Sequence, residues 1–181
     1  LDEAEQAIFE ISEKKIRPAF FPIKDIVKDS FRTIEELYAR KELITGVPTG
    51  FEKVDDLTSG LQNADLIIIA GRPSMGKTAF ALNIAQYVGI HRALPVCLFS
   101  LEMAKEQIAM RMLAATAKVD SQRIRKGFLG ETDWPKLTTA AGILSEAPIF
   151  IDDTAAITVL EMKAKARRLK AEHGLGLVII D

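Results

Sequence analysis

The chain has 181 residues, of which 48% are hydrophobic and 27% charged, a balance that excludes an intrinsically disordered polypeptide. Lys and Arg number 24 and Asp and Glu number 25, so the formal net charge is -1, which excludes a protein that holds nucleic acid through bulk positive charge. A single cysteine, Cys97, excludes a disulfide framework and suits a reducing compartment. We expect a cytoplasmic protein of one domain with an appendage, not a membrane protein, and the start at Leu1 indicates part of a longer chain.

The appendage is residues 1–43, which we predict to be a helical connector and linker helix. Leu1–Lys15 reads as the end of a helix, and Pro18 and Pro22 then interrupt helical structure, because proline disfavours helix at itself and at the preceding residue. Residues 23–40 are the next predicted helix, whose apolar residues recur at three- and four-residue steps and share one face. That face either packs on its own domain or docks on a neighbouring subunit, and the pattern alone leaves both interpretations open. The apolar residues are Ile23, Ile26, Val27, Phe31, Ile34, Leu37 and Tyr38.

Residues 44–181 begin with a turn-rich junction and then alternate predicted strands with predicted helices. Short aliphatic runs predict buried strands at 66–70, 96–99, 149–151 and 177–180. Amphipathic patterns predict helices at 78–88, 104–117, 121–126, 133–144 and 158–173. In the short helix at 121–126, Ser121 is the expected N-cap and Gly127 the stop. This alternation indicates the α/β class, with a mostly parallel sheet covered by helices.

A glycine-containing loop joins the strand predicted at 66–70 to the helix predicted at 78–88. Its sequence, Gly71-Arg72-Pro73-Ser74-Met75-Gly76-Lys77-Thr78, matches the G-x-x-x-x-G-K-[ST] pattern of a phosphate-binding P-loop. Glycine lets backbone N–H groups approach phosphate oxygens, and the N-terminus of a helix adds partial positive charge. Lys77 supplies a positive charge for the β- and γ-phosphates, and the Thr78 hydroxyl is an oxygen ligand of the kind that Mg²⁺ prefers. The sequence therefore predicts a site for ATP and Mg²⁺ at residues 71–78.

Nucleotide hydrolysis also needs a group that activates water and a second anchor for the metal. Glu102 lies just past the strand predicted at 96–99, where parallel strands face a ligand, so its carboxylate can orient and deprotonate water. Alternatively, the negative charge of Glu102 stabilises the N-terminus of the following helix. Asp181 ends an aliphatic run, as does the acid of a Walker B strand, which holds Mg²⁺. Asp152 has the same local pattern and is a rival for that role.

Four stretches of sequence together resemble the replicative hexameric DNA helicases of bacteria, the DnaB family. They are Ile44-Thr45-Gly46-Val47-Pro48-Thr49-Gly50-Phe51, the loop at 71–78, Phe99-Ser100-Leu101-Glu102-Met103 and His173-Gly174-Leu175-Gly176-Leu177-Val178-Ile179-Ile180-Asp181. The resemblance implies a RecA-like ATPase core in residues 44–181, truncated after the Walker B strand. It also implies that residues 23–40 are a linker helix that packs on an adjacent subunit.

The resemblance also implies roles for individual residues. Glu102 and Lys77 would be catalytic, the loop at 71–78 would bind the nucleotide, and Thr78 and Asp181 would coordinate Mg²⁺. Asp181 is thereby preferred to Asp152 as the Walker B acid. The family's arginine finger and DNA-binding loops would lie beyond this chain.

An ATP-driven replicative DNA helicase is the function that this resemblance implies. Such a motor would move along single-stranded DNA at a replication fork and unwind duplex DNA in the 5′-to-3′ direction. Its expected partners are further copies of itself in a homohexamer, a primase and a helicase loader. Two other functions stay open: a RecA-type recombinase or KaiC-like ATPase, and a nucleotide-gated assembly module without catalysis.

Basic residues outside the P-loop have less specific interpretations. Arg111 could approach the nucleotide, and the cluster Arg123, Arg125 and Lys126 could contact a phosphate backbone. Such charges also serve as ordinary solvated surface, and the sequence does not separate these roles.

Overall fold

A computed structural model describes residues 21–40 and 43–181 of the chain, so the helix predicted over Leu1–Lys15 lies outside the described residues. The chain divides into two compact units, residues 1–42 and residues 43–181, each of which is described by itself.

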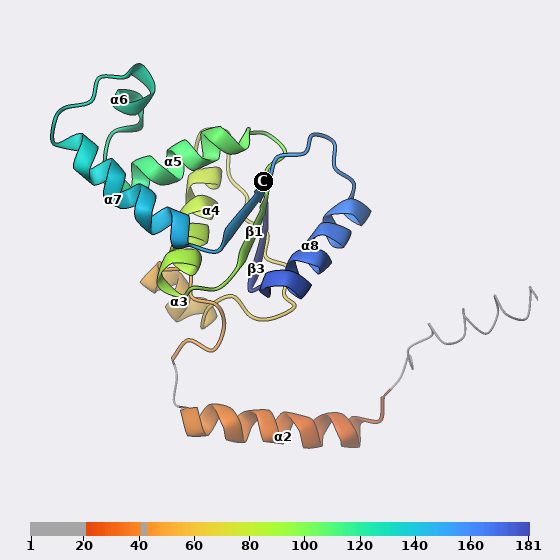
Figure 1. Ribbon diagram of the computed structural model, residues 1–181. Coiled ribbons are helices and arrows are strands. Elements are labelled where there is room, and N and C mark those ends of the chain that lie inside the picture. Colours follow the sequence, from red (N-terminus) through yellow and green to blue (C-terminus); the bar gives the residue numbers. More distant parts are fainter. Residues whose placement is uncertain (1–20, 41–42) are drawn as a thin grey trace, which may run out of the picture. The chain divides into compact units, whose positions relative to one another are not determined.

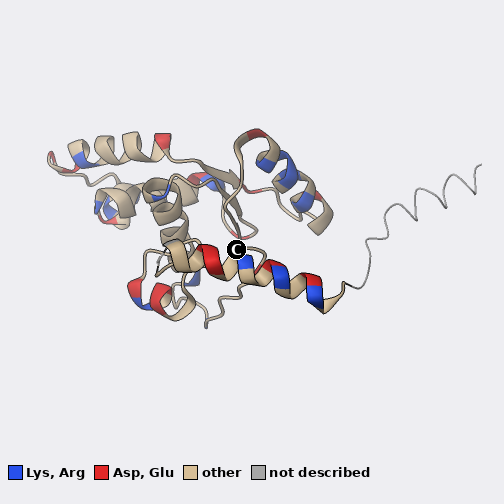
Figure 2. Ribbon diagram, turned by 90° about the horizontal axis from the view of Figure 1, so that it is seen from below, with Lys and Arg blue, Asp and Glu red and all other residues tan. Residues whose placement is uncertain are grey.

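The first unit contains helix α2, Ile23–Arg40, at the bounds that the apolar periodicity predicts. Its apolar stripe is exposed: Phe31 retains 62% and Ile34 57% of its accessible surface. Lysines and arginines alternate with acidic residues along the helix (Figure 2). Alternating charges beside an exposed apolar stripe are typical of a helix that covers another surface.

The second unit is organised around a parallel sheet of three strands in the order β2-β1-β3. These strands are β1, Val96–Phe99, β2, Ile149–Asp152, and β3, Leu177–Ile180. Each residue of β1 is buried, as its aliphatic and aromatic sequence predicts for a central strand. The register sets Phe99 beside Asp152 and Ile180, so the carboxyl ends of all three strands meet at one edge.

Helices cover both faces of this sheet (Figure 1). On one side lie α4, Lys77–Gln86, α5, Lys105–Ala117, and α7, Asp133–Glu146, and on the other lies α8, Val159–His173. A π-helical turn, Tyr87–His91, continues α4 toward β1. The main core lies between the strands and helices α4 and α5 and contains Leu82, Ile84, Ala85, Val88, Val96, Leu98, Ile108 and Met112.

The short helix α6, Ser121–Lys126, has a different N-cap from the one predicted. Its N-cap is Asp120, not Ser121, because the Asp120 carboxylate accepts hydrogen bonds from the backbone N–H groups of Gln122 and Arg123. The negative charge of Asp120 also interacts favourably with the partial positive charge at the helix N-terminus, so Asp120 is a stronger cap than Ser121. The stop at Gly127 is confirmed, and its φ of 74° is the left-handed conformation that glycine adopts easily.

The strand predicted at Leu66–Ala70 is absent, and this prediction is wrong for the structure. The run pairs with none of the strands described, and Leu66 retains 88% of its accessible surface. A strand requires a hydrogen-bonded neighbour, and an apolar run supplies only the propensity for one.

Helix α3, Glu52–Thr58, was not predicted from the sequence. It follows a turn in which the buried carboxylate of Asp55 accepts hydrogen bonds from the backbone N–H and hydroxyl of Thr49, at 2.8 and 2.7 Å, and from the N–H of Gly50. An antiparallel bridge between Val47 and Leu61 closes this segment onto the core. None of the helices in the described part of the chain combines the length and apolar character that crossing a membrane requires.

Candidate nucleotide-binding site

The predicted phosphate loop leads directly into helix α4. Gly76 is the N-cap residue, and no side chain caps the helix, so the N–H groups of its first turn have no side-chain acceptor. Ser74 and Gly76 both have positive φ, 65° and 88°, which folds the backbone into a tight turn. Residues 71–77 are exposed. An exposed turn with uncapped N–H groups at a helix N-terminus suits the binding of an anion.

Glycine at position 76 is explained by backbone conformation. A Cβ there would meet no atom within 4 Å, so space is not the constraint. The φ of 88° lies in the region that side-chain-bearing residues rarely adopt. The second glycine of the motif therefore sets the direction in which the chain enters α4.

Asp181 joins the loop to the end of the sheet. The Thr78 hydroxyl donates a hydrogen bond of 2.7 Å to one Asp181 carboxylate oxygen, and Lys77 Nζ lies 3.7 Å from the other. The Asp181 side chain is only 7% exposed, whereas that of Lys77 is 43% exposed. Lys77 and Thr78 thus lie together with Asp181, which is distant from them in sequence, at the carboxyl end of β3.

Glu102 lies on a turn that follows β1 at the same edge of the sheet. The N–H of Leu101 donates a hydrogen bond of 2.7 Å to the backbone carbonyl of Asp181, so the turn is tied to the residue that contacts Thr78. Glu102 itself is exposed. Its carboxylate is therefore open to water, at the edge of the sheet where β3 ends in Asp181.

The rival acid Asp152 is engaged elsewhere. Its carboxylate pairs with Lys165 of α8 and accepts a hydrogen bond from the N–H of Thr154. Burial acts to raise the pKa of Asp152, but the hydrogen bonds from Lys165 and Thr154 outweigh it and lower that pKa to about 2. Its neighbour Asp153 accepts from the N–H of Lys105 at the start of α5. The contacts of both acids are thus with the segments that carry α5 and α8.

The residues present fit a magnesium ion that is shared with a nucleotide. The hydroxyl of Thr78 and the carboxylate of Asp181 are hard oxygen donors within hydrogen-bond distance of each other. Among residues 21–40 and 43–181, no cluster of three His, Cys, Asp or Glu side chains forms a cage made of protein alone. Mg²⁺ characteristically takes one or two protein ligands and completes its shell with phosphates and water, which agrees with this donor set.

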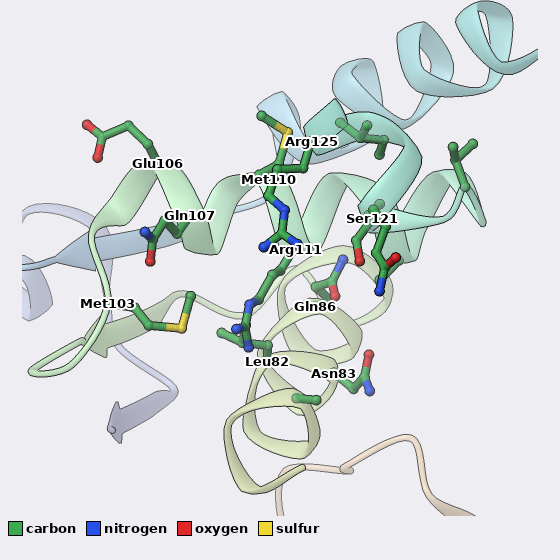
Figure 3. Close-up of a pocket in the computed structure, with 16 residues that line it drawn as sticks. Leu82, Asn83, Gln86, Met103, Glu106, Gln107, Met110, Arg111, Ser121 and Arg125 are labelled. Carbon is green, nitrogen blue, oxygen red and sulfur yellow. The ribbon is translucent and has the colours of Figure 1, made fainter. Parts of the chain in front are cut away.

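The basic residues outside the loop have different surroundings. Arg123 pairs with the buried carboxylate of Asp133 at 2.8 Å and also donates to the carbonyl of Phe128, so it fixes the connection from α6 to α7. Arg111 and Arg125 instead line a groove between α4, α5 and α6 with a volume of about 920 Å³ (Figure 3). The apolar part of its lining consists of Ala79, Leu82, Met103, Met110, Ala114, Ala115, Val119 and Ile124.

Ser100, which the sequence did not single out, lies at the start of the turn that carries Glu102. It is 3% exposed, and its hydroxyl both donates to the carbonyl of Met103, at 2.8 Å, and accepts from the N–H of Met103, at 3.2 Å. The available signal was a serine placed directly between a buried strand and the predicted catalytic acid.

Comparisons with known proteins bear on the whole chain. The family described as DnaB-like helicase C terminal domain matches residues 46–181. The replicative DNA helicase DnaC of Bacillus subtilis (strain 168) and the replicative DNA helicase DnaB of Geobacillus stearothermophilus are each 52% identical over 181 residues. Those matches cover 100% of this chain and 40% of each relative, so the chain spans less than half the length of these relatives.

Two solved structures also match. One is an ATPase domain with a TM-score of 0.79 and 37% identity, and the match covers 86% of this chain and 56% of that one. The other is a DnaB-like replicative helicase, described together with its interactions with primase, with a TM-score of 0.77 and 34% identity. That match covers 100% of this chain and 43% of the other.

Proposed function

We propose, because the chain belongs to the DnaB-like helicase family, that it is the ATP-binding and ATP-hydrolysing part of a replicative DNA helicase. Residues 1–43 would be the connector and linker helix, and residues 44–181 the first part of the motor domain. The full-length protein would use ATP hydrolysis to move along single-stranded DNA and unwind duplex DNA at a replication fork, in the 5′-to-3′ direction.

The observation that carries this proposal is the contact between Thr78 and Asp181. It joins the end of a P-loop sequence to the end of a Walker B-like strand, across 103 positions of sequence, through a hydrogen bond of 2.7 Å. A chance glycine-rich turn would have no reason to meet an acid at the carboxyl end of a parallel strand.

Each site residue has a role that its chemistry supports. The N–H groups at the start of α4 and the ammonium of Lys77 would bind the phosphates. Thr78 and Asp181 would hold Mg²⁺, which when bound neutralises charge on the phosphates. Glu102 would orient the attacking water and accept its proton. Arg72, Pro73, Ser74 and Met75 would shape the loop between its glycines, Gly71 and Gly76.

Calorimetry with ATP and Mg²⁺ tests the binding step. Lys77→Ala should abolish measurable affinity, because it removes the positive charge that faces the phosphates. Lys53→Ala, which removes an equal charge from the exposed surface of α3, should leave affinity unchanged. Equal affinity in wild type and Lys77→Ala would refute the proposal.

Glu102→Gln tests hydrolysis in the full-length protein. The amide is nearly isosteric but a very poor base, so we expect ATP binding to persist and turnover to fall by roughly 100-fold or more. Wild-type turnover in this variant would favour a different base. No hydrolysis in either protein would favour a nucleotide-gated assembly module. Unwinding of forked duplexes with either tail polarity separates a helicase from a recombinase.

The partners that we propose are partners of the full-length protein. We propose that α2 docks on an adjacent copy in a homohexamer, and that the groove between α4, α5 and α6 receives it. The apolar stripe of α2 supports this, and so do the apolar residues that line the groove. Primase, a helicase loader and single-stranded DNA are further expected partners, and the solved DnaB-like helicase is itself described with primase.

A pair of cysteines tests the docking. Ile34→Cys combined with Ile124→Cys should form a disulfide between chains under mild oxidation, whereas Glu36→Cys with Ile124→Cys should not, because Glu36 lies on the opposite side of α2. Equal cross-linking of both pairs, or of neither, would rule out this groove as the receiving surface.

A further inference from the structure

We infer that Ser100 is a positioning residue for Glu102: it closes the turn that holds the catalytic carboxylate, without touching the nucleotide itself. This inference rests on the proposed function, because it concerns the step in which Glu102 activates water.

The turn from Phe99 to Met103 is anchored on both sides of Glu102. The N–H of Ser100 donates to the carbonyl of Asp152 on β2, at 2.8 Å, and the N–H of Leu101 donates to the carbonyl of Asp181, at 2.7 Å. The side chain of Met103 packs on the main core. Glu102 thus projects from a segment that is held before and after it.

The Ser100 hydroxyl makes the contact that closes this turn. It donates to the Met103 carbonyl and accepts from the Met103 N–H, so a single oxygen atom satisfies both backbone groups of one residue. Ser100 is buried, so water cannot easily replace the hydroxyl if it is removed. Ala at this position would leave two backbone groups without their partner, and the backbone on either side of Glu102 could then change direction.

Small displacements of a base matter because proton abstraction requires close approach to the attacking water. Misplacement of a catalytic group by about 1 Å can cost about 100-fold in rate. In the proposed site, the loop at 71–78 and the Asp181 carboxylate hold ATP and Mg²⁺, and the turn contacts Asp181 only at its backbone carbonyl. A positioning role for Ser100 therefore predicts an effect on kcat with little effect on nucleotide affinity.

The test is a set of four full-length proteins: wild type, Ser100→Ala, Glu102→Gln and the double variant. We expect Ser100→Ala to lower kcat for ATP hydrolysis by roughly 10- to 100-fold while the Kd for ATP stays within about twofold. In the Glu102→Gln background, Ser100→Ala should lower kcat by less than about twofold more, because its effect passes through the missing carboxylate. Independent, multiplying losses would overturn the inference, as would a wild-type kcat in Ser100→Ala.

Two further variants separate positioning from folding. Ser100→Cys fills the space of the hydroxyl with a somewhat larger, weakly hydrogen-bonding thiol and leaves no cavity, so it should show the same selective loss of kcat even if Ser100→Ala does not fold. Ser145→Ala removes a hydroxyl that donates only within α7 and should leave kcat unchanged. Wild-type kcat in Ser100→Cys would contradict the inference.

The result also separates this inference from the proposed function. If Glu102→Gln abolishes turnover and Ser100→Ala does not change it, only the role of Ser100 is wrong. If Glu102→Gln turns over normally, the proposed base itself is wrong.

Discussion

Asp55 shows how one buried carboxylate can organise a turn. It is 4% exposed and accepts hydrogen bonds from the N–H and hydroxyl of Thr49 and from the N–H of Gly50. Asp55→Ala would leave the buried N–H and hydroxyl of Thr49 unsatisfied, so we expect it to lower the free energy of unfolding by about 2–4 kcal/mol. Urea denaturation monitored by circular dichroism measures this change.

The neighbouring residue is a matched control for that prediction. Asp56 is exposed on the same helix, so Asp56→Ala should change the free energy of unfolding by less than about 0.5 kcal/mol. Similar losses for the two variants would mean that the helix tolerates neither change, and that the hydrogen bonds of Asp55 are not the cause.

Asp152 makes the free energy of unfolding depend on pH. Its folded-state pKa of about 2 lies below its ordinary value of 3.8, so the stabilisation it provides is present above pH 3.8 and is lost as the pH falls toward 2. Lys165→Met removes the partner whose hydrogen bond lowers this pKa. At pH 7 it should lower the free energy of unfolding by about 1 kcal/mol, because Lys165 is partly exposed and the pair is screened.

Urea denaturation at several pH values checks this sign. The difference between wild type and Lys165→Met should shrink between about pH 4 and pH 2, while Lys163→Met, an exposed lysine on the same helix, should behave as wild type throughout. A difference that stayed constant down to about pH 2 would assign the effect of Lys165 to packing of its aliphatic stem.

At the scale of elements, α8 depends on a capping box. The Thr158 hydroxyl accepts from the N–H of Glu161, and the Glu161 carboxylate accepts from the N–H and hydroxyl of Thr158. Thr158→Ala should lower the free energy of unfolding by about 1 kcal/mol. Thr132 precedes α7 without making a side-chain cap, so Thr132→Ala should be nearly neutral in the same denaturation experiment. Equal effects of both changes would exclude the capping hydrogen bonds as the cause.

The sequence predicts an element when the cause of that element lies in a short stretch of residues, and fails when the element depends on distant residues. The RecA-like α/β fold is confirmed, and so are the strands predicted at 96–99, 149–151 and 177–180, the second of which extends to Asp152. Continuous aliphatic runs are typical of strands in a parallel sheet covered by helices, and β1 at its centre is fully buried. The run at Leu66–Ala70 has the same composition but lacks a strand partner within the described residues. Pairing is a long-range property that no local pattern contains.

In the candidate site, too, local features could be predicted from the sequence, whereas contacts between distant residues needed more than a local pattern. The loop at 71–78 is a local motif in which spacing alone places a turn and a helix N-terminus. The approach of Thr78 to Asp181 required the motif together with the strand register. Ser100 escaped prediction because its role depends on a hydroxyl geometry that a one-letter sequence does not specify.

At the scale of the whole molecule, α2 and the core form separate compact units, which has a consequence for mutagenesis. The proposed assembly depends on the apolar stripe of α2, whereas the proposed nucleotide site lies entirely in residues 71–181. Changes on α2 should therefore alter assembly without altering the affinity of a single copy for ATP.

Phe31→Glu tests this separation in the full-length protein. Phe31 is exposed in the stripe, and burying a carboxylate against an apolar surface is costly, so the variant should shift the proposed hexamer toward smaller species. Light scattering after size exclusion measures the mass, and Glu36→Gln, on the polar side of α2, should keep the wild-type mass. Calorimetry should find wild-type ATP affinity in the dissociated variant, while kcat falls because an adjacent subunit would no longer complete the site. An unchanged mass in Phe31→Glu would remove α2 from the interface, and lost ATP affinity would mean that the two units are not independent.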